Sequence, residues 1–184
     1  QMGILRCDHP DLDEFIHAKD DNGLANFNIS VGVTDAFMQA VEDDVEFELV
    51  HPAQPGAALI EQGAQQRPTD GLWVYRTVRA RALMDDIVHA TYDHADPGVV
   101  FLDRMNQENN LWYVEVIEAT NPCSEQSLPD YGCCCLGSID LTRFVERAFE
   151  SDAGFDWTGF KDVVRTAVRM LDNVLEVTWW PLPE

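Results

Sequence analysis

The most constraining stretch of this sequence runs from Asn121 to Glu125, and a cysteine-rich stretch over 131–137 follows it at once. Pro122 has no amide hydrogen and disfavours helical angles at the residue before it, so this backbone is expected to be extended. Alternate side chains of an extended chain point to the same face. Asn121, Cys123 and Glu125 would then share one face over roughly 13 Å, at about 3.3 Å per residue. An amide, a thiol and a carboxylate in line predict a site.

An ordinary explanation of the same residues also exists. Asx-Pro often opens a turn, a surface Glu is commonly only solvated, and one Cys among apolar residues is usually a small buried hydrophobe. Clustered cysteines favour the site, because thiol reactivity explains them more often than packing does. Four cysteines lie within thirteen positions, namely Cys123, Cys133, Cys134 and Cys135.

The excess of acidic over basic side chains limits the kinds of molecule that this chain is expected to bind. The chain carries 33 acidic and 12 basic side chains, a net charge of −21, and only two of the basic residues are lysines. Such a surface would repel phosphate groups, so nucleic-acid binding through a basic patch is not expected. A dense acidic surface suits a cytoplasm of molar salt, where the Debye length falls to about 3 Å. The composition resembles that of salt-loving archaea, with an acidic mesophilic protein as the alternative.

The length of 184 residues allows at most one ordinary domain. The sequence does not open on Met and ends on Pro-Leu-Pro-Glu, and we expect both ends to have been cut from a longer chain. No apolar run approaches the roughly 18 residues that a membrane span needs, and no secretory signal is recognisable. Five cysteines without an export signal indicate reduced or redox-active thiols in the cytoplasm.

Hydrophobic periodicity predicts strands alternating with helices, which is typical of an α/β fold. The predicted strands are 2–7, 27–33, 42–49, 74–78, 99–102 and 113–117, with loops over 51–67 and 103–111. The predicted helices are 12–18, 35–41 with Thr34 or Asp35 as its cap, 79–93, 140–148, and 160–177 with Asp156 as its cap. The buried stripe of the helix over 79–93 is expected to consist of Leu83, Ile87, Val88 and Thr91.

Several of these stretches resemble the large chain of ribonucleotide reductases. The stretches 121–129 and 131–141 look like the active-site segment of that family, and further matches are 5–11, 26–38, 97–104 and 171–175. The similarity runs nearly end to end and is weakest over 42–72. It is strongest to the adenosylcobalamin-dependent branch, class II. The alternative is class I, in which a second, metal-containing subunit makes the radical.

The resemblance implies a ten-stranded α/β barrel in which a finger loop carries a radical cysteine into the centre, and residues 1–184 would form a single partial barrel domain. The thiyl-radical cysteine of the family matches Cys123, and its catalytic Asn and Glu match Asn121 and Glu125. One cysteine of the family's redox pair matches Cys134, and the partner cysteine lies outside this sequence. The substrate would bind at Asn121, Pro122, Cys123, Ser124 and Glu125.

A loop and two departures from the family complete the expected site. The family usually has Gly where Ser124 stands and Asn where Asp140 stands, and Ser124 would add bulk beside the substrate. Cys7 matches no position of the redox pair and is expected to be a small buried residue. The loop that links the effector to the substrate base in the family corresponds to Asp21, Asn22, Gly23, Leu24, Ala25 and Asn26.

The implied reaction removes the 2′-hydroxyl of a ribonucleotide, expected to be a diphosphate, for DNA precursor synthesis. Cys123 as a thiyl radical would take the 3′-hydrogen, Glu125 would take the 3′-hydroxyl proton, and Asn121 would orient the sugar. Cys134 and its partner would supply two electrons and be reduced by a thioredoxin- or glutaredoxin-type protein. The implied cofactor is adenosylcobalamin. Deoxynucleotides or ATP would be effectors, the full-length chain a homodimer, and this stretch alone inactive.

Proteins of other classes remain as rivals. A zinc-binding or thiol-redox module could use Cys123 and the cysteines at 133–135. Its ligand spacing is unfavourable, because no Cys-x₂₋₄-Cys pair exists and three consecutive residues do not easily bind one tetrahedral ion, so no metal site is predicted. A non-catalytic acidic interaction domain would explain the charge but not the grouping of Asn121, Cys123 and Glu125.

Overall fold

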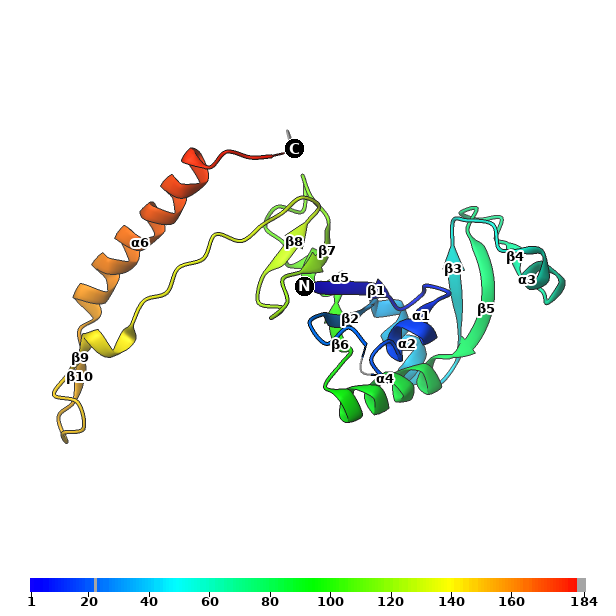
Figure 1. Cartoon of the computed structure of the whole chain (residues 1–184), viewed down its shortest axis with the longest axis horizontal. Coiled ribbons are helices and arrows are strands. Elements are labelled where there is room, and N and C mark those ends of the chain that lie inside the picture. The colour runs from blue at the N-terminus through cyan, green and yellow to red at the C-terminus, as the bar shows by residue number, and fades with distance from the viewer. Residues whose placement is uncertain (22, 182–184) are drawn as a thin grey trace. The chain divides into compact units, whose positions relative to one another are not determined.

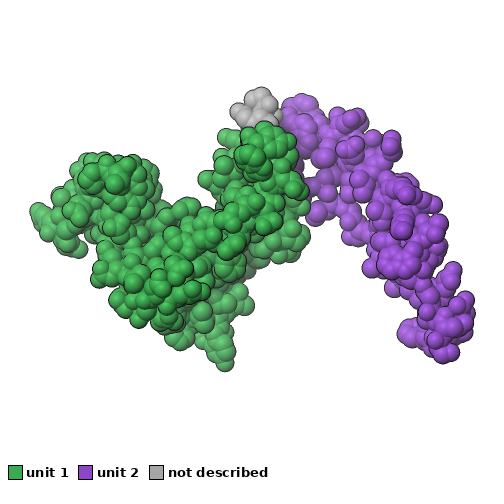
Figure 2. Space-filling model, turned by 180° about the vertical axis from the view of Figure 1, so that it is seen from behind, with its two compact units in different colours: residues 1–132 green, residues 133–184 purple. Residues whose placement is uncertain are grey.

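The computed structural model describes residues 1–21 and 23–181. It divides into two compact units, residues 1–132 and residues 133–184, which Figure 2 shows in different colours. Each unit has its own elements and is described by itself. In the two described ranges no helix is both long enough and apolar enough to cross a membrane.

A three-stranded parallel sheet forms the centre of the first unit (Figure 1). Its strands β1 (Met2–Arg6), β2 (Asn28–Val33) and β6 (Gly98–Phe101) lie in the order β1-β2-β6. The central strand β2 is buried at five of its six residues, as expected for a parallel strand covered on both faces. The strands predicted over 2–7 and 27–33 are therefore confirmed.

Three helices build the hydrophobic core against this sheet. They are α1 (Leu12–Ile16), α2 (Asp35–Asp43) and α4 (Ala80–His94). Thr34 caps α2, since its Oγ1 accepts a hydrogen bond from the amide of Phe37 at 3.1 Å. All three predicted helices are confirmed, with ends that differ by a few residues.

The buried face of α4 differs in part from the predicted stripe. Its buried residues are Ala80, Leu83, Ile87 and Ala90, whose spacing of three and four residues defines a single helical face. Val88 lies about 100° around the helix from Ile87 and is 55% exposed, so its predicted burial is wrong. Ala80 and Ala90 complete the buried face instead.

An antiparallel sheet follows α2 in the chain. Strand β3 (Glu46–His51) pairs with β5 (Trp73–Arg79), and the short β4 (Gln65–Gln66) pairs with the other edge of β5. The predicted edge strand is confirmed from Glu46 onward, whereas residues 42 and 43 belong to the end of α2. The expected loop over 51–67 contains β4 and a short helix, α3 (Ala57–Glu61).

The segment before the predicted site is more helical than expected. The predicted polar loop over 103–111 is wrong at its start, where α5 (Leu102–Gln107) follows β6 directly. Asn106 explains this helix, because its amide nitrogen donates to the carbonyl oxygens of Leu102 and Ile117 at 2.9 and 2.8 Å. The strand predicted over 113–117 begins only at Ile117, as β7 (Ile117–Thr120), which pairs with β8 (Ser127–Pro129).

The second unit is built around one long helix, α6 (Trp157–Val177). Asp156 caps it as predicted, its Oδ1 accepting from the amide of Gly159 at 2.9 Å. The helix predicted over 140–148 is wrong: a single 3₁₀ turn, η1 (Leu141–Phe144), leads into a small hairpin of β9 (Val145–Glu146) and β10 (Gly154–Phe155). Trp179 and Trp180, which follow α6, are exposed in this structure.

The observed architecture is a mixed α/β fragment, which confirms the α/β class. Its sheets contain two or three strands each, and the described residues form no closed barrel. Strand β6 corresponds to the strand predicted over 99–102. It lies at a sheet edge, and its Phe101 is 48% exposed.

Candidate active site

The predicted catalytic residues lie in the turn between β7 and β8, residues 121–126, which we call the Cys123 turn. The amide of Asn121 donates to the carbonyl of Gln126 at 3.1 Å, and the amide of Ser124 donates to the carbonyl of Asn121 at 2.9 Å. The expected extended backbone with three side chains on one face is therefore wrong. Pro122 lies within a tight turn instead, as an Asx-Pro pair permits.

The turn brings two of the predicted side chains into contact. The side-chain nitrogen of Asn121, Nδ2, donates to Oε1 of Glu125 at 2.5 Å. The side-chain oxygen of Asn121, Oδ1, accepts from the backbone amide of Gln126 at 3.0 Å. Cys123 lies between them in the sequence, exposed and free of any disulfide. The turn thus presents a thiol next to an amide held by a carboxylate. This grouping suits a site that orients a polar substrate beside sulfur.

Ser124 adopts a backbone conformation that favours glycine. Its φ of 62° lies in the left-handed region, where a Cβ atom is unfavourable. Its Oγ accepts a hydrogen bond from the hydroxyl of Thr120 at 3.3 Å, which contributes to holding the turn. Glycine at this position, as in the related family, would adopt the same conformation without strain.

This conformation predicts opposite outcomes for two substitutions. Ser124→Val is expected to destabilise the first unit by about 1–2 kcal/mol, because a β-branched residue is strained at positive φ. Ser124→Gly is expected to change stability by less than about 1 kcal/mol, since relief of strain offsets the greater freedom of the unfolded chain. Thermal unfolding of the two variants tests this prediction. An equal decrease in stability in both variants would contradict the assigned conformation.

The predicted effector loop lies between α1 and β2. Asp21, Gly23, Leu24, Ala25 and Asn26 are exposed there, and Asn22 lies outside the described residues. Two contacts hold the ends of this segment. Lys19 Nζ pairs with Asp96 Oδ2 at 2.5 Å in a partly buried position, and the amide of Phe27 donates to the carbonyl of Leu24 at 2.9 Å. No contact tests a role in effector binding, which stays a prediction.

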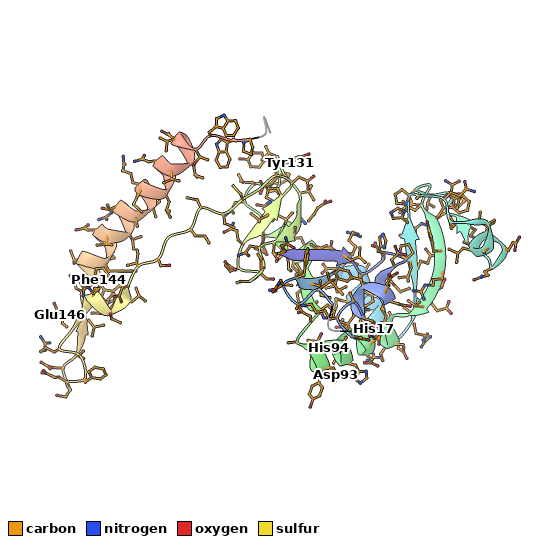
Figure 3. The ribbon with its side chains drawn as sticks, viewed as in Figure 1. His17, Asp93, His94, Tyr131, Phe144 and Glu146 are labelled. Carbon is orange, nitrogen blue, oxygen red and sulfur yellow. The ribbon has the colours of Figure 1, made fainter. Side chains whose placement is uncertain are left out.

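A histidine–aspartate network joins the start of this loop to α4. His17 Nδ1 contacts Asp20 Oδ2 at 2.9 Å and His17 Nε2 contacts Asp86 Oδ2 at 3.1 Å, while Asp20 Oδ1 also contacts His94 Nε2 at 3.2 Å. His17 and His94 lie close together in Figure 3. Burial lowers the pKa of His17, but the hydrogen bonds to Asp86 and Asp20 outweigh it, and the net shift of the pKa is upward. Sequence reasoning missed this network because its members come from separate elements.

The raised pKa of His17 predicts a pH dependence of stability. The folded state binds this proton more tightly than the unfolded state, so the stabilisation is complete below the unfolded pKa of about 6.5. It is lost as pH rises through the higher folded value. When the pH is raised from 6 to 8, the thermal midpoint of unfolding should therefore decrease less in His17→Gln than in the parent chain. His89→Gln, which changes an exposed histidine of α4, is the control; equal pH profiles for His17→Gln and the parent would contradict the assignment.

The remaining cysteines differ in their surroundings. Cys7 is fully buried beside Thr34, and burial raises the pKa of its thiol to about 11, which confirms it as a small buried residue. In the second unit Cys135 Sγ donates to the carbonyl of Leu171 on α6 at 3.8 Å. A Cβ on Gly137 would also meet Leu171, at 3.4 Å. Cys134, immediately before Cys135, is half-buried and forms no disulfide.

A cavity of about 670 Å³ lies apart from these residues, at the carboxyl end of β1. Its lining includes Arg6, which is paired with Asp8, and the neighbouring rings of His9 and His51. None of the predicted site residues lines it. Sequence reasoning could not find it, because its lining comes from segments that are distant along the chain.

The fold and the turn together define a mixed α/β unit that presents a free thiol beside a hydrogen-bonded amide–carboxylate pair. The chain belongs to the ribonucleotide reductase family, since the family model for the ribonucleotide reductase barrel domain matches residues 1–184. The resemblance of the stretches around Cys123 is thereby confirmed at the level of the family.

Individual relatives agree with this assignment. The chain is 37% identical over 185 residues to the vitamin B12-dependent ribonucleoside-diphosphate reductase of Thermoplasma acidophilum, and 38% identical over 185 residues to the protein of that name from Mycobacterium tuberculosis, with all of this chain covered. It is 26% identical over 191 residues to the large subunit of the vaccinia virus reductase, with 96% covered. The chain spans 21%, 24% and 24% of the lengths of these three relatives.

Proposed function

We propose that this chain is part of the catalytic chain of an adenosylcobalamin-dependent ribonucleotide reductase, which converts ribonucleoside diphosphates to 2′-deoxyribonucleotides for DNA synthesis. The observation that carries the proposal is the Cys123 turn, in which an exposed free thiol lies between a hydrogen-bonded Asn121 and Glu125 in a chain of this family. Residues 1–184 would form one partial barrel domain, completed by the rest of a longer chain to ten strands, with the Cys123 turn as its finger loop.

The residues of the turn divide the chemistry among them. Cys123 as a thiyl radical removes the 3′-hydrogen of the ribose and later returns it. Glu125 takes the 3′-hydroxyl proton as general base, while the Asn121 amide holds the sugar hydroxyls in position. Pro122 and Ser124 complete the surface that faces the sugar. The 2′-hydroxyl departs as water once the neighbouring carbon carries the radical.

The electrons come from a dithiol. Cys134 and a partner cysteine outside this sequence give up two electrons and two protons and become a disulfide, so the net reaction consumes a ribonucleotide and a dithiol and yields a deoxyribonucleotide, a disulfide and water. A thioredoxin- or glutaredoxin-type protein then reduces the disulfide by thiol exchange. The free, half-buried thiol of Cys134 supports this role.

The proposed cofactor requires an accessible, reduced thiol in the site. Adenosylcobalamin, when bound, supplies a radical through homolysis of its cobalt–carbon bond. The thiol that receives it must be reachable and unoxidised, and the exposed, unpaired Cys123 meets both conditions. The identity of 37% and 38% to two B12-dependent relatives, against 26% to the viral large subunit, favours this cofactor over a separate radical-generating subunit.

The proposal also includes effectors, an oligomeric state and a cellular location. Residues 21–26 would relay the identity of a deoxynucleotide or ATP effector to the substrate base, and the full-length chain would form a homodimer. The acidic, lysine-poor composition supports a halophilic archaeal origin and a cytoplasmic location, because high salt screens the repulsion within a chain of charge −21. Retention of activity in molar salt, but not in dilute buffer, would test that setting.

The full-length protein provides the test of the proposed function. Purified alone and supplied with adenosylcobalamin, a ribonucleoside diphosphate and a dithiol, it is expected to form the deoxynucleotide. Product formed only after addition of a second, metal-containing protein would instead establish the class I alternative. Zinc bound in stoichiometric amount by Cys123 and Cys133–Cys135, with no reductase activity, would favour the zinc module.

A further inference from the structure

One hydrogen bond ties the Cys123 turn to the central sheet. The side-chain amide of Asn28, the first residue of β2, donates to the carbonyl oxygen of Pro122 at 2.8 Å, although the two residues are 94 positions apart. In the described part of the chain, every other hydrogen bond of the turn stays within the β7–β8 hairpin. Asn28 is therefore the polar anchor of the turn on another element.

The anchored atom lies immediately before the reactive residue. The carbonyl of Pro122 and the amide nitrogen of Cys123 belong to the same planar peptide group. A hydrogen bond that orients this carbonyl therefore orients the whole plane, one bond before the Cα of Cys123. After Cys123, the hydrogen bond from the Ser124 amide to the Asn121 carbonyl closes the turn. Cys123 is thus held from both sides.

Asn28 is itself firmly placed. Its own amide donates to the carbonyl of Gln1 at 2.9 Å. The amide of the next residue, Ile29, donates to Asp96 Oδ1 at 3.4 Å. The other oxygen of Asp96 pairs with Lys19, which lies two residues before the predicted effector loop, and side-chain exposures of 13% and 20% protect this pair from water. The contacts therefore run from Lys19 through Asp96 and the start of β2 to the Cys123 turn.

We propose that Asn28 is a positioning residue for Cys123, and that its hydrogen bond to Pro122 couples the turn, through Asp96, to Lys19 just before the predicted effector loop. The inference rests on the proposed role of Cys123 in hydrogen abstraction. Abstraction requires close approach of sulfur to the 3′-hydrogen, and a displacement of about 1 Å can cost about 10²-fold in rate. Asn28 does not touch the reacting atoms in this account; it fixes the peptide that carries the thiol.

Two variants of the full-length protein remove the hydrogen bond with little change elsewhere. Asn28→Asp keeps the shape of the side chain but replaces the N–H donor by an oxygen, and Asn28→Ala removes the group. Asn28 is exposed, so neither variant creates a cavity. Asn110→Ala is the matched control, because Asn110 is also exposed and its side chain has no hydrogen bond among the described residues.

The first measurement is the steady-state rate with normal and 3′-deuterated substrate. Both Asn28 variants are expected to lose about 10²-fold in kcat with little change in KM, and the deuterium isotope effect on kcat should increase because abstraction becomes more rate-limiting. A merely structural role would lower the amount of active protein and leave the isotope effect unchanged. An isotope effect equal to that of the parent and of Asn110→Ala would overturn the proposal.

The second measurement does not depend on activity. Hydrogen exchange of the Ser124 and Gln126 amides, both hydrogen-bonded within the turn, should be faster in the Asn28 variants and unchanged in Asn110→Ala. Unchanged exchange would also overturn the proposal. Should the parent protein lack reductase activity, the proposed function fails, and the exchange result still decides whether Asn28 holds the turn.

Discussion

Cys123→Ser in the full-length protein is expected to abolish deoxynucleotide formation, with a loss on the order of 10⁴-fold or more, as for removal of a residue that reacts covalently. The O–H bond of serine is stronger than the S–H bond of cysteine, so serine does not form the radical that takes the 3′-hydrogen. Substrate binding should be largely retained, because Asn121 and Glu125 keep their hydrogen bond across the turn. Turnover assays and equilibrium binding of the nucleotide measure the two effects separately.

The control for this variant is Cys133→Ser. Cys133 is exposed and free like Cys123, and no reaction step is assigned to it. It should keep the rate of the parent protein. Measurable turnover in Cys123→Ser would remove Cys123 from the radical role and would leave the family membership of the chain untouched.

Cys134→Ser is expected to block repeated turnover with a thioredoxin-type reductant. A single remaining thiol of the pair cannot form the disulfide that releases two electrons to the substrate. Folding should be unaffected, because serine is close to cysteine in size and the half-buried Cys134 side chain makes no hydrogen bond in the described part of the chain. The assay is the amount of deoxynucleotide formed per enzyme molecule over time.

Cys135→Ser separates the redox role from packing. Its thiol contacts the carbonyl of Leu171, so its replacement should affect the stability of the second unit rather than the chemistry. Unchanged steady-state activity in Cys134→Ser, together with a loss in Cys133→Ser or Cys135→Ser, would transfer the redox role to the cysteine whose loss matters.

The elements that were predicted well have local causes. The spacing of Leu83 and Ile87 identified α4, and Asp156 marked the start of α6, because helical period and capping depend on residues within a few positions of each other. The 3₁₀ turn after Asp140 was predicted as a longer helix from a similar signal. There the chain turns into the β9–β10 hairpin, and Phe144 packs on Phe155 and Phe160 instead of continuing a helix.

The candidate site was predicted in composition but not in shape. Asn121, Cys123 and Glu125 were grouped on the assumption of an extended chain, yet Asn121 and Glu125 meet because the backbone turns. Pro122 permits both conformations, and the pairing of β7 with β8 selects the turn. The left-handed conformation of Ser124 likewise depends on this hairpin and not on serine itself.

The sequence by itself determined the α/β class and most of the helix starts, because side-chain periodicity and capping are local properties; it also named the candidate residues Asn121, Cys123 and Glu125, whose roles stay predictions. Only the tertiary structure decided that the thiol of Cys123 lies on a turn, that Asn28 holds this turn from the central sheet, and that Cys135 contacts Leu171 on α6. Each of these rests on contacts between residues far apart in the chain, and such contacts exist only once the elements have packed.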